Sequence, residues 1–267
     1  MSPVHGGDIS DAYQIQTETK PYFLKLNSVD YAETMFKAEA LGLRLISESG
    51  AIAAPHVLTT GKIGNHAYLI LEFIRSGSKT ADAMASFGRQ LALMHSANHI
   101  QFGLETDNFI GRLPQSNQRH DDWVSFYINE RLMPQFKMAL DDNLMTISDV
   151  PSLHLLESRL QSLMPEVNAS LLHGDLWGGN YLIDQKGKPY LIDPAVYYGH
   201  SEVDIAMSRL FGGFSSAFYE AYFEILPQEK YFNERMDIYQ LYYLLVHLNL
   251  FGSSYYDSVR SIIRKYF

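Results

Sequence analysis

The segment from Leu171 to Pro194, LLHGDLWGGNYLIDQKGKPYLIDP, constrains this chain more than any other. It carries a His-Gly-Asp triplet, then Asn180 and Asp193, between short apolar runs. The stretch Tyr181–Tyr190 has the pattern of a β-hairpin that turns at Lys186-Gly187. Because a hairpin returns the chain to its starting point, we expect Asp193 to lie close to Asn180.

Asp175 and Asn180 have the spacing of the catalytic loop H-R-D-x-x-x-x-N of protein kinases. From such a loop a carboxylate can reach an attacking hydroxyl while an amide oxygen reaches a metal ion. Asp193 would approach the same ion from another direction, as the octahedral oxygen ligation of Mg²⁺ around nucleotide phosphates requires. The segment therefore predicts a phosphotransfer site. The alternative is a purely structural loop.

Composition excludes several classes of protein. The 267 residues are 46% hydrophobic, and the formal net charge of −9 argues against a nucleic-acid partner, which would need clustered Lys and Arg. The absence of cysteine rules out a disulfide framework or a thiolate nucleophile and is compatible with the cytoplasm, where we expect the protein. The stretch Tyr239–Phe251 is too short and too polar to span a bilayer, and predicts a buried helix.

The N-terminal part predicts strands followed by one helix. Lys25 shares one face of the strand Tyr22–Leu26 with Phe23, so its ammonium needs a partner. Glu39 lies on the apolar stripe of a helix expected at about Tyr31–Glu48 and is the candidate. A strand Lys paired with a helix Glu orients phosphates in kinase-like folds. A structural ion pair is the alternative.

A glycine-bearing turn precedes these strands and contains Gly6, Gly7 and Ser10. Such a turn can place backbone N–H groups over nucleotide phosphates, because glycine permits close approach. An ordinary hairpin turn fits the same residues, so the turn alone does not decide between the two.

The segment Arg75–Lys79 has the composition of a linker, and we place a lobe boundary there, between residues 1–74 and 75–267. Just before it, the backbone of Glu72, Phe73 and Ile74 would meet the adenine ring in a two-lobed kinase-like protein. Beyond it the pattern changes to helices, apart from an irregular stretch at 102–117.

Three polar residues outside the central segment need an interpretation. His95 and His99 have metal-ligand spacing on a helix, but no Glu follows the first one as in H-E-x-x-H, so we interpret them as structural. Asp204 either forms a capping box with Ser201 or supports the catalytic loop from beneath. The sequence leaves these two interpretations of Asp204 open.

The motifs HGDLWGGN and LIDPAVYYGHSEVD resemble those of the fructosamine/ketosamine kinase family, a branch of the aminoglycoside-phosphotransferase and protein-kinase-like superfamily. The segments GGDIS, DNFIGRLPQSN, DDWVSFYINERLMPQ and HLNLFGSSYY are similar too, so that the resemblance covers nearly the whole chain. It implies an α+β, bilobal protein-kinase-like fold with a small β-rich N-terminal lobe containing one helix and a larger, mainly helical C-terminal lobe.

The resemblance also implies an activity: ATP- and Mg²⁺-dependent phosphorylation of the 3-hydroxyl of a ketosamine, small or protein-bound, after which the product releases the amine. By position, Asp175 would be the catalytic base, and Asn180 and Asp193 the metal ligands. Trp177 would be a platform for the sugar or the amine. The nucleotide phosphates would lie under Gly6, Gly7 and Ser10 and against the pair Lys25–Glu39.

Three other functions stay open at this point. The first is a different small-molecule kinase, for an aminoglycoside, choline or a homoserine-like alcohol. The second is a nucleotide-binding pseudokinase, against which the intact Lys25, Asp175, Asn180 and Asp193 argue. The third is a protein kinase, disfavoured because no A-P-E-type segment follows Asp193.

Overall fold

The computed structural model describes residues 2–4 and 10–267, so that Gly6 and Gly7 lie outside the described residues. The N-terminal part is an antiparallel five-stranded sheet in the order β1-β2-β3-β5-β4. The strands are β1 (Ser2–Pro3), β2 (Asp11–Gln16), β3 (Pro21–Asn27), β4 (Val57–Ile63) and β5 (His66–Glu72). Strand β3 pairs with both β2 and β5, which places Lys25 in the centre of the sheet.

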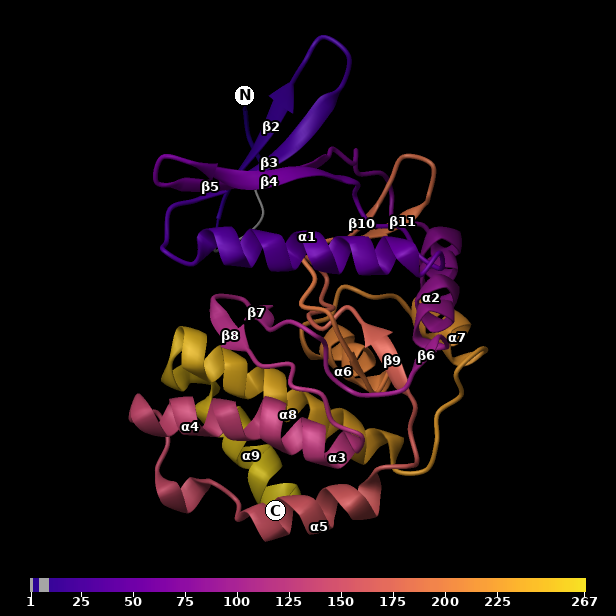
Figure 1. Cartoon of the computed structure of the whole chain (residues 1–267). Coiled ribbons are helices and arrows are strands. Elements are labelled where there is room, and N and C mark those ends of the chain that lie inside the picture. The colour runs from indigo at the N-terminus through magenta and orange to yellow at the C-terminus, as the bar shows by residue number, and fades with distance from the viewer. Residues whose placement is uncertain (1, 5–9) are drawn as a thin grey trace.

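Helix α1 (Ala32–Glu48) lies between this sheet and the rest of the molecule (Figure 1). Its apolar stripe of Phe36, Ala40, Leu43 and Ile46 is fully buried, because these residues recur at helical spacing on one face. Glu39 extends from the same helix with only 14% of its side chain exposed. The amphipathic pattern thus fixes the direction in which Glu39 points.

The C-terminal part is mainly helical and lies on the other side of α1 (Figure 1). Its helices are α2 (Ala81–His95), α3 (Trp123–Phe126), a π-helix at Tyr127–Leu132, α4 (Met133–Asp141), α5 (Leu153–Leu163), α6 (Glu202–Leu210), α7 (Ser216–Phe223), α8 (Phe232–Phe251) and α9 (Tyr256–Tyr266), with 3-10 turns at Ile147–Asp149 and Ser253–Tyr255. A sheet in the N-terminal part, followed by helices in the C-terminal part, is the predicted α+β arrangement.

Short strands connect these helices and carry the loops of interest. They are β6 (Asn98–His99), β7 (Asn108–Ile110), β8 (Leu113–Gln115), β9 (Ala169–Leu172), β10 (Tyr181–Ile183), β11 (Pro189–Leu191) and β12 (Tyr197–Gly199). The prediction of an irregular stretch at 102–117 was wrong in part, because β7 and β8 pair as a hairpin there. Three-residue strands are too short to show an alternating pattern in the sequence.

The segment between β5 and α2 contacts the hairpin β10–β11. The backbone N–H of Gly77 donates to the carbonyl oxygen of Ile183 (2.7 Å), and a Cβ at Gly77 would collide with the backbone of Asp184. Glycine is therefore required at this close approach. The predicted division between residues 74 and 75 falls in this segment and stays a prediction.

Helix α8 forms the centre of the helical part. It runs for 20 residues, of which 12 are buried, in line with the buried helix predicted from its sequence. Across residues 2–4 and 10–267, no helix combines the length and the apolarity needed to cross a bilayer.

Candidate active site

Strand β9 leads directly into the loop that carries Asp175. Gly174, which precedes Asp175, has a φ of +82°, and a Cβ there would collide with the carbonyl oxygen of Ala195. Both observations demand glycine. The backbone N–H of Ala195 also donates to the carbonyl oxygen of His173 (2.9 Å). The loop that carries Asp175 is thus in direct contact with the chain that follows Asp193.

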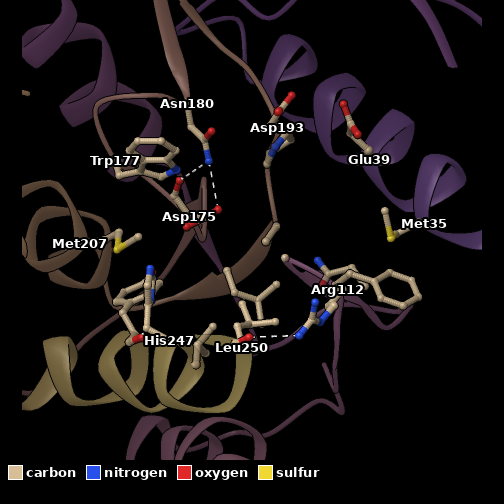
Figure 2. Close-up of a pocket in the computed structure, with 18 of the residues that line it drawn as sticks. Met35, Glu39, Arg112, Asp175, Trp177, Asn180, Asp193, Met207, His247 and Leu250 are labelled. Atoms are coloured by element: carbon tan, nitrogen blue, oxygen red, sulfur yellow. Dashed lines mark hydrogen bonds between the residues drawn. The ribbon is translucent and has the colours of Figure 1, made fainter. Parts of the chain in front are cut away.

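Asn180 lies beside Asp175, as the spacing predicts. Its side-chain amide donates to the backbone carbonyl oxygen of Asp175 (2.8 Å) and to Oδ2 of the carboxylate (3.0 Å). Because both donated bonds come from the amide nitrogen, the amide oxygen of Asn180 faces away from Asp175 and toward Asp193 (Figure 2). An acceptor oxygen is therefore available on the side of Asn180 that faces Asp193.

The predicted hairpin brings Asp193 back to this point. Tyr181 pairs with Leu191 across β10 and β11, and the backbone N–H of Ile192 donates to the carbonyl oxygen of Asn180 (3.0 Å). Asp193 follows with a φ of +53°, a conformation that costs energy for a residue other than glycine. This backbone conformation directs its side chain toward β3 and α1.

Lys25 connects the sheet, the helix and the hairpin. Its Nζ donates to Oε1 of Glu39 (2.8 Å), the predicted partner, and to Oδ1 of Asp193 (2.7 Å). Burial by itself lowers the pKa of Lys25, but the charges of Asp193 and Glu39 more than offset this and hold that pKa above its ordinary value. Lys25 is therefore a permanent cation between two carboxylates.

The carboxyl group of Asp175 has an altered affinity for protons. Its pKa is raised to about 7, chiefly by burial and also by the negative charges of Asp193 and Asp204, against the opposing effect of the hydrogen bond from Asn180. A carboxyl group with a pKa near neutrality is well matched to accept a proton from an alcohol and to release it again.

Asp204, at the start of α6, supports the catalytic loop. The residue is fully buried, and its carboxylate accepts hydrogen bonds from the backbone N–H groups of His173 (2.7 Å) and Gly174 (2.9 Å). Ser201 makes no side-chain capping bond at the helix N-terminus. Of the two interpretations that the sequence left open, support of the loop is therefore the one realised.

Two histidines extend this support. His173 Nε2 bonds to the carbonyl oxygen of Ile192 (2.8 Å) and its Nδ1 accepts from the N–H of Asp175 (3.2 Å), which fixes the neutral tautomer with the proton on Nε2. Burial also lowers the pKa of His173. His95 contacts Asp204 through Nε2 (3.1 Å) and Tyr222 through Nδ1 (2.8 Å), so it is part of the same network.

The hairpin β7–β8 holds the chain that follows Asp193, a role that the sequence did not reveal. Asn108 Nδ2 donates to the carbonyl oxygen of Val196 (2.7 Å), and Gln115 Nε2 donates to Oδ1 of Asn108 (2.7 Å). The hydroxyl of Tyr242 donates to Oε1 of Gln115 (2.6 Å). The signal available in the sequence was the presence of two amide side chains within ten residues, because an amide that becomes buried needs a partner.

A cavity of about 540 Å³ extends from Lys25 to the end of α8. Its lining includes the charged groups described above and Ser10, together with the ring-bearing side chains of Trp177, Phe211, His247, Phe251 and Tyr255. Trp177 lies beside Asp175 with 41% of its surface exposed (Figure 2). Its ring covers Gly179, where a Cβ would collide with it, which explains one glycine of LWGGN.

The remaining candidate residues lie around this region. Ser10 Oγ accepts a hydrogen bond from Asn27 Nδ2 (3.1 Å), and Ser10 borders the cavity beside Lys25. Glu72 ends β5 and pairs through its backbone N–H with the carbonyl oxygen of His56 (2.9 Å). Phe73 and Ile74 follow in the segment that leads to α2. Contact of these three residues with adenine stays a prediction.

The sequence profile named Fructosamine kinase matches residues 1–267. The chain belongs to the fructosamine kinase family. A protein of Lactiplantibacillus plantarum named probable ketoamine kinase is 42% identical over 269 residues, which cover 100% of this chain and 94% of that protein. The chloroplastic protein-ribulosamine 3-kinase of Arabidopsis thaliana is 39% identical over 274 residues, covering 100% of this chain and 82% of that protein.

Solved structures agree with this membership. A crystal structure from Haemophilus somnus 129PT, assigned as a fructosamine-3-kinase, aligns with a TM-score of 0.90 at 29% identity and covers 100% of this chain and 90% of that one. An aminoglycoside-3'-phosphotransferase of type VIII aligns with a TM-score of 0.52 at 16% identity, covering 98% and 89%, which shows the shared fold. The fructosamine kinase family member described here thus has the predicted protein-kinase-like fold.

Proposed function

We propose that this fructosamine kinase family member transfers the γ-phosphoryl group of ATP to the 3-hydroxyl of a ketosamine, whose product then releases the amine. The observation that carries this proposal is that Asp175 and Trp177, from one loop, border the same cavity as the trio Lys25, Glu39 and Asp193. The names of the relatives, ketoamine kinase and ribulosamine 3-kinase, support the acceptor class.

The donor atoms of the site fit Mg²⁺ held together with phosphates. The amide oxygen of Asn180 is directed away from Asp175, and Asp193 uses Oδ1 for Lys25, which leaves Oδ2 for a metal. Among the described residues no cluster of three or more His, Cys, Asp or Glu could enclose an ion. Mg²⁺ usually takes one or two protein ligands and completes its shell with phosphate oxygens and water.

Each residue then has a distinct role. Asn180 and Asp193 hold Mg²⁺, which when bound offsets the charge of the phosphates. Lys25, oriented by Glu39, binds phosphate oxygens. Asp175 orients the 3-hydroxyl of the acceptor and takes its proton as the oxygen–phosphorus bond forms and the bond from the γ-phosphorus to the leaving ADP breaks. Ser10 closes over the phosphates, and the same role is proposed for Gly6 and Gly7, which lie outside the described residues.

Trp177 is proposed as a platform for the acceptor. A tryptophan in a catalytic loop is costly to expose unless its face is used, and the face of an indole binds sugar C–H groups and cationic amines well. The backbone of residues 72–74 is proposed to bind adenine, and the cytoplasm is proposed as the compartment.

The test is an ATP-consumption assay with Mg²⁺ on a panel of a ribulosamine, an erythrulosamine, a fructosamine, an aminoglycoside and choline. Turnover of a ketosamine that vanishes in Asp175→Ala supports the proposal, and the order within the panel identifies the sugar. Turnover of the aminoglycoside or choline alone refutes the acceptor class. Nucleotide binding, titrated on the same sample, without turnover of any acceptor would indicate a pseudokinase.

A further inference from the structure

Arg112 lies in the turn of the hairpin β7–β8, next to Gly111, whose φ is +59°. From this turn its side chain crosses to the end of α8, where Nη2 donates to the carbonyl oxygen of Leu250 (3.0 Å; Figure 2). Leu250 is in the last turn of its helix, where carbonyl oxygens have no partner within the helix. This bond holds the guanidinium at the wall of the cavity.

The charge of Arg112 is not neutralised by a neighbour. Of the described residues that line the cavity, Lys25 and Arg112 are the permanent cations. Lys25 is paired with two carboxylates, whereas no ion pair found in residues 2–4 and 10–267 involves Arg112. A guanidinium has several N–H donors, and the bond to Leu250 uses one of them.

The position of Arg112 indicates which part of a substrate it would meet. Glu39 and Asp193, with Lys25, lie on one side of the cavity, whereas Arg112 lies on another side, next to Leu250 at the end of α8 (Figure 2). With the sugar hydroxyl at Asp175, as the proposed function requires, an acceptor in this cavity would extend from Asp175 toward Arg112. The substituent on the amine then points toward the guanidinium.

We propose that Arg112 binds a carboxylate on the amine portion of the ketosamine, so that the favoured substrates are glycated amino acids rather than glycated neutral amines. This inference rests on the proposed function. The planar fork of a guanidinium matches a carboxylate in two parallel hydrogen bonds. In a chain with a net charge of −9, a local cation is also needed to draw in an anionic substrate.

The alternative is that Arg112 only attaches the β7–β8 hairpin to α8. Two matched substrate pairs separate the two roles: the ketosamines of glycine and of 6-aminohexanoic acid, each compared with its carboxamide. The acid and amide of a pair have nearly the same shape, but the amide lacks the negative charge and replaces one acceptor oxygen by a donor. The two chain lengths cover different distances from the amine to the carboxylate. The quantity to measure is the acid-to-amide ratio of kcat/KM.

For the wild-type enzyme we expect a ratio of about ten or more in at least one pair, since a hydrogen bond between charged groups gives about a tenfold to hundredfold effect. Arg112→Gln should bring this ratio close to one, mainly through KM, and Arg112→Lys should give an intermediate ratio. Arg89→Gln, an exposed arginine of α2 outside the cavity lining, is the control and should keep the wild-type ratio.

Two results would overturn the inference: a wild-type ratio near one in both pairs, or an equal loss on acid and amide in Arg112→Gln. If the wild-type enzyme turns over no ketosamine at all, the proposed function fails. Calorimetric titration of the acids and amides into wild type and Arg112→Gln then decides the inference separately. Tighter binding of an acid that depends on Arg112 upholds it, and equal or absent binding refutes it.

Discussion

The side chain of Asn180 donates to Asp175 twice, to its backbone carbonyl oxygen at 2.8 Å and to its carboxylate at 3.0 Å. One short loop thereby fixes the direction of the carboxylate and of the amide oxygen together. The proton acceptor and a metal ligand of the proposed mechanism are therefore positioned by the same pair of bonds, and neither can move without the other.

Asn180→Asp should lower kcat by at least about a hundredfold. The substitution replaces two donated bonds by repulsion between adjacent carboxylates, although an oxygen ligand is retained. Steady-state kinetics with the preferred ketosamine measures the effect. Asn129→Asp, an exposed position whose amide donates to Ser125, is the control. A kcat within threefold of wild type would contradict the assigned geometry.

Glu39→Gln should raise KM for ATP and lower kcat/KM about tenfold or more, because Lys25 would lose the carboxylate that orients it toward phosphate. Glu33→Gln on the same helix is a matched control, since Glu33 forms an exposed i,i+4 pair with Lys37 (2.7 Å). It should change kcat/KM less than twofold. If Glu39→Gln alters only thermal stability and leaves the ATP kinetics unchanged, the pair is structural.

Asp204→Asn should destabilise the fold by about 3 kcal/mol and lower kcat without changing KM for ATP greatly. The amide nitrogen of Asn would face an N–H group of His173 or Gly174 and leave a buried donor without a partner. Urea unfolding and kinetics on the same sample measure both effects. Asp82→Asn, exposed in the first turn of α2, should be close to wild type in both. Unchanged stability in Asp204→Asn would contradict the assignment of Asp204 as the residue that supports the catalytic loop.

His200 should make the protein sensitive to acid. Its pKa is lowered from 6.5 to about 3, chiefly by burial and also by the positive charge of Arg235. The unfolded chain therefore binds a proton that the folded chain does not, so stability is complete above pH 6.5 and is lost as pH falls toward 3. At about 1.4 kcal/mol per pH unit, the full shift corresponds to a loss of roughly 5 kcal/mol.

The measurement compares urea unfolding of wild type and His200→Gln between pH 7 and pH 4. Gln cannot titrate and keeps a polar atom for Tyr239, whose hydroxyl lies 2.6 Å from Nδ1 of His200. The variant should lose less stability than wild type on acidification. The exposed His154→Gln should follow the wild-type curve. Parallel curves for His200→Gln and wild type would show that His200 does not limit acid stability.

Much of the site could be predicted because its residues are close in sequence or follow a strict period. Asp175, Asn180 and Asp193 lie within one loop and one hairpin, whose turn at Asp184–Lys188 is closed by a backbone hydrogen bond of 2.9 Å. Glu39 could be predicted from the helical spacing of the apolar residues around it. Lys25 could be predicted from the alternation of side chains between the two faces of its strand. Such local rules depend on backbone geometry, which the sequence pattern reports directly.

The contacts that hold the loop from a distance could not be predicted in this way. The sequence allowed two roles for Asp204, and only the tertiary placement of α6 next to the loop after β9 brings its carboxylate to His173 and Gly174. In the same way, Asn108 meets Val196 across 88 residues of chain. Nothing in a single sequence records which distant backbone group a buried amide will find.

The sequence by itself determined the chemistry of this protein: which carboxylates, amide and lysine are present, and their order in a loop, a hairpin and a strand–helix pair. The tertiary structure decided what supports and surrounds them, namely the network around Asp204, the hairpin that holds the chain after Asp193, and the guanidinium of Arg112 at the cavity wall. The physical reason is that local order follows from backbone periodicity, whereas partners distant in the chain are selected by packing, which satisfies buried polar groups only when the whole core has formed.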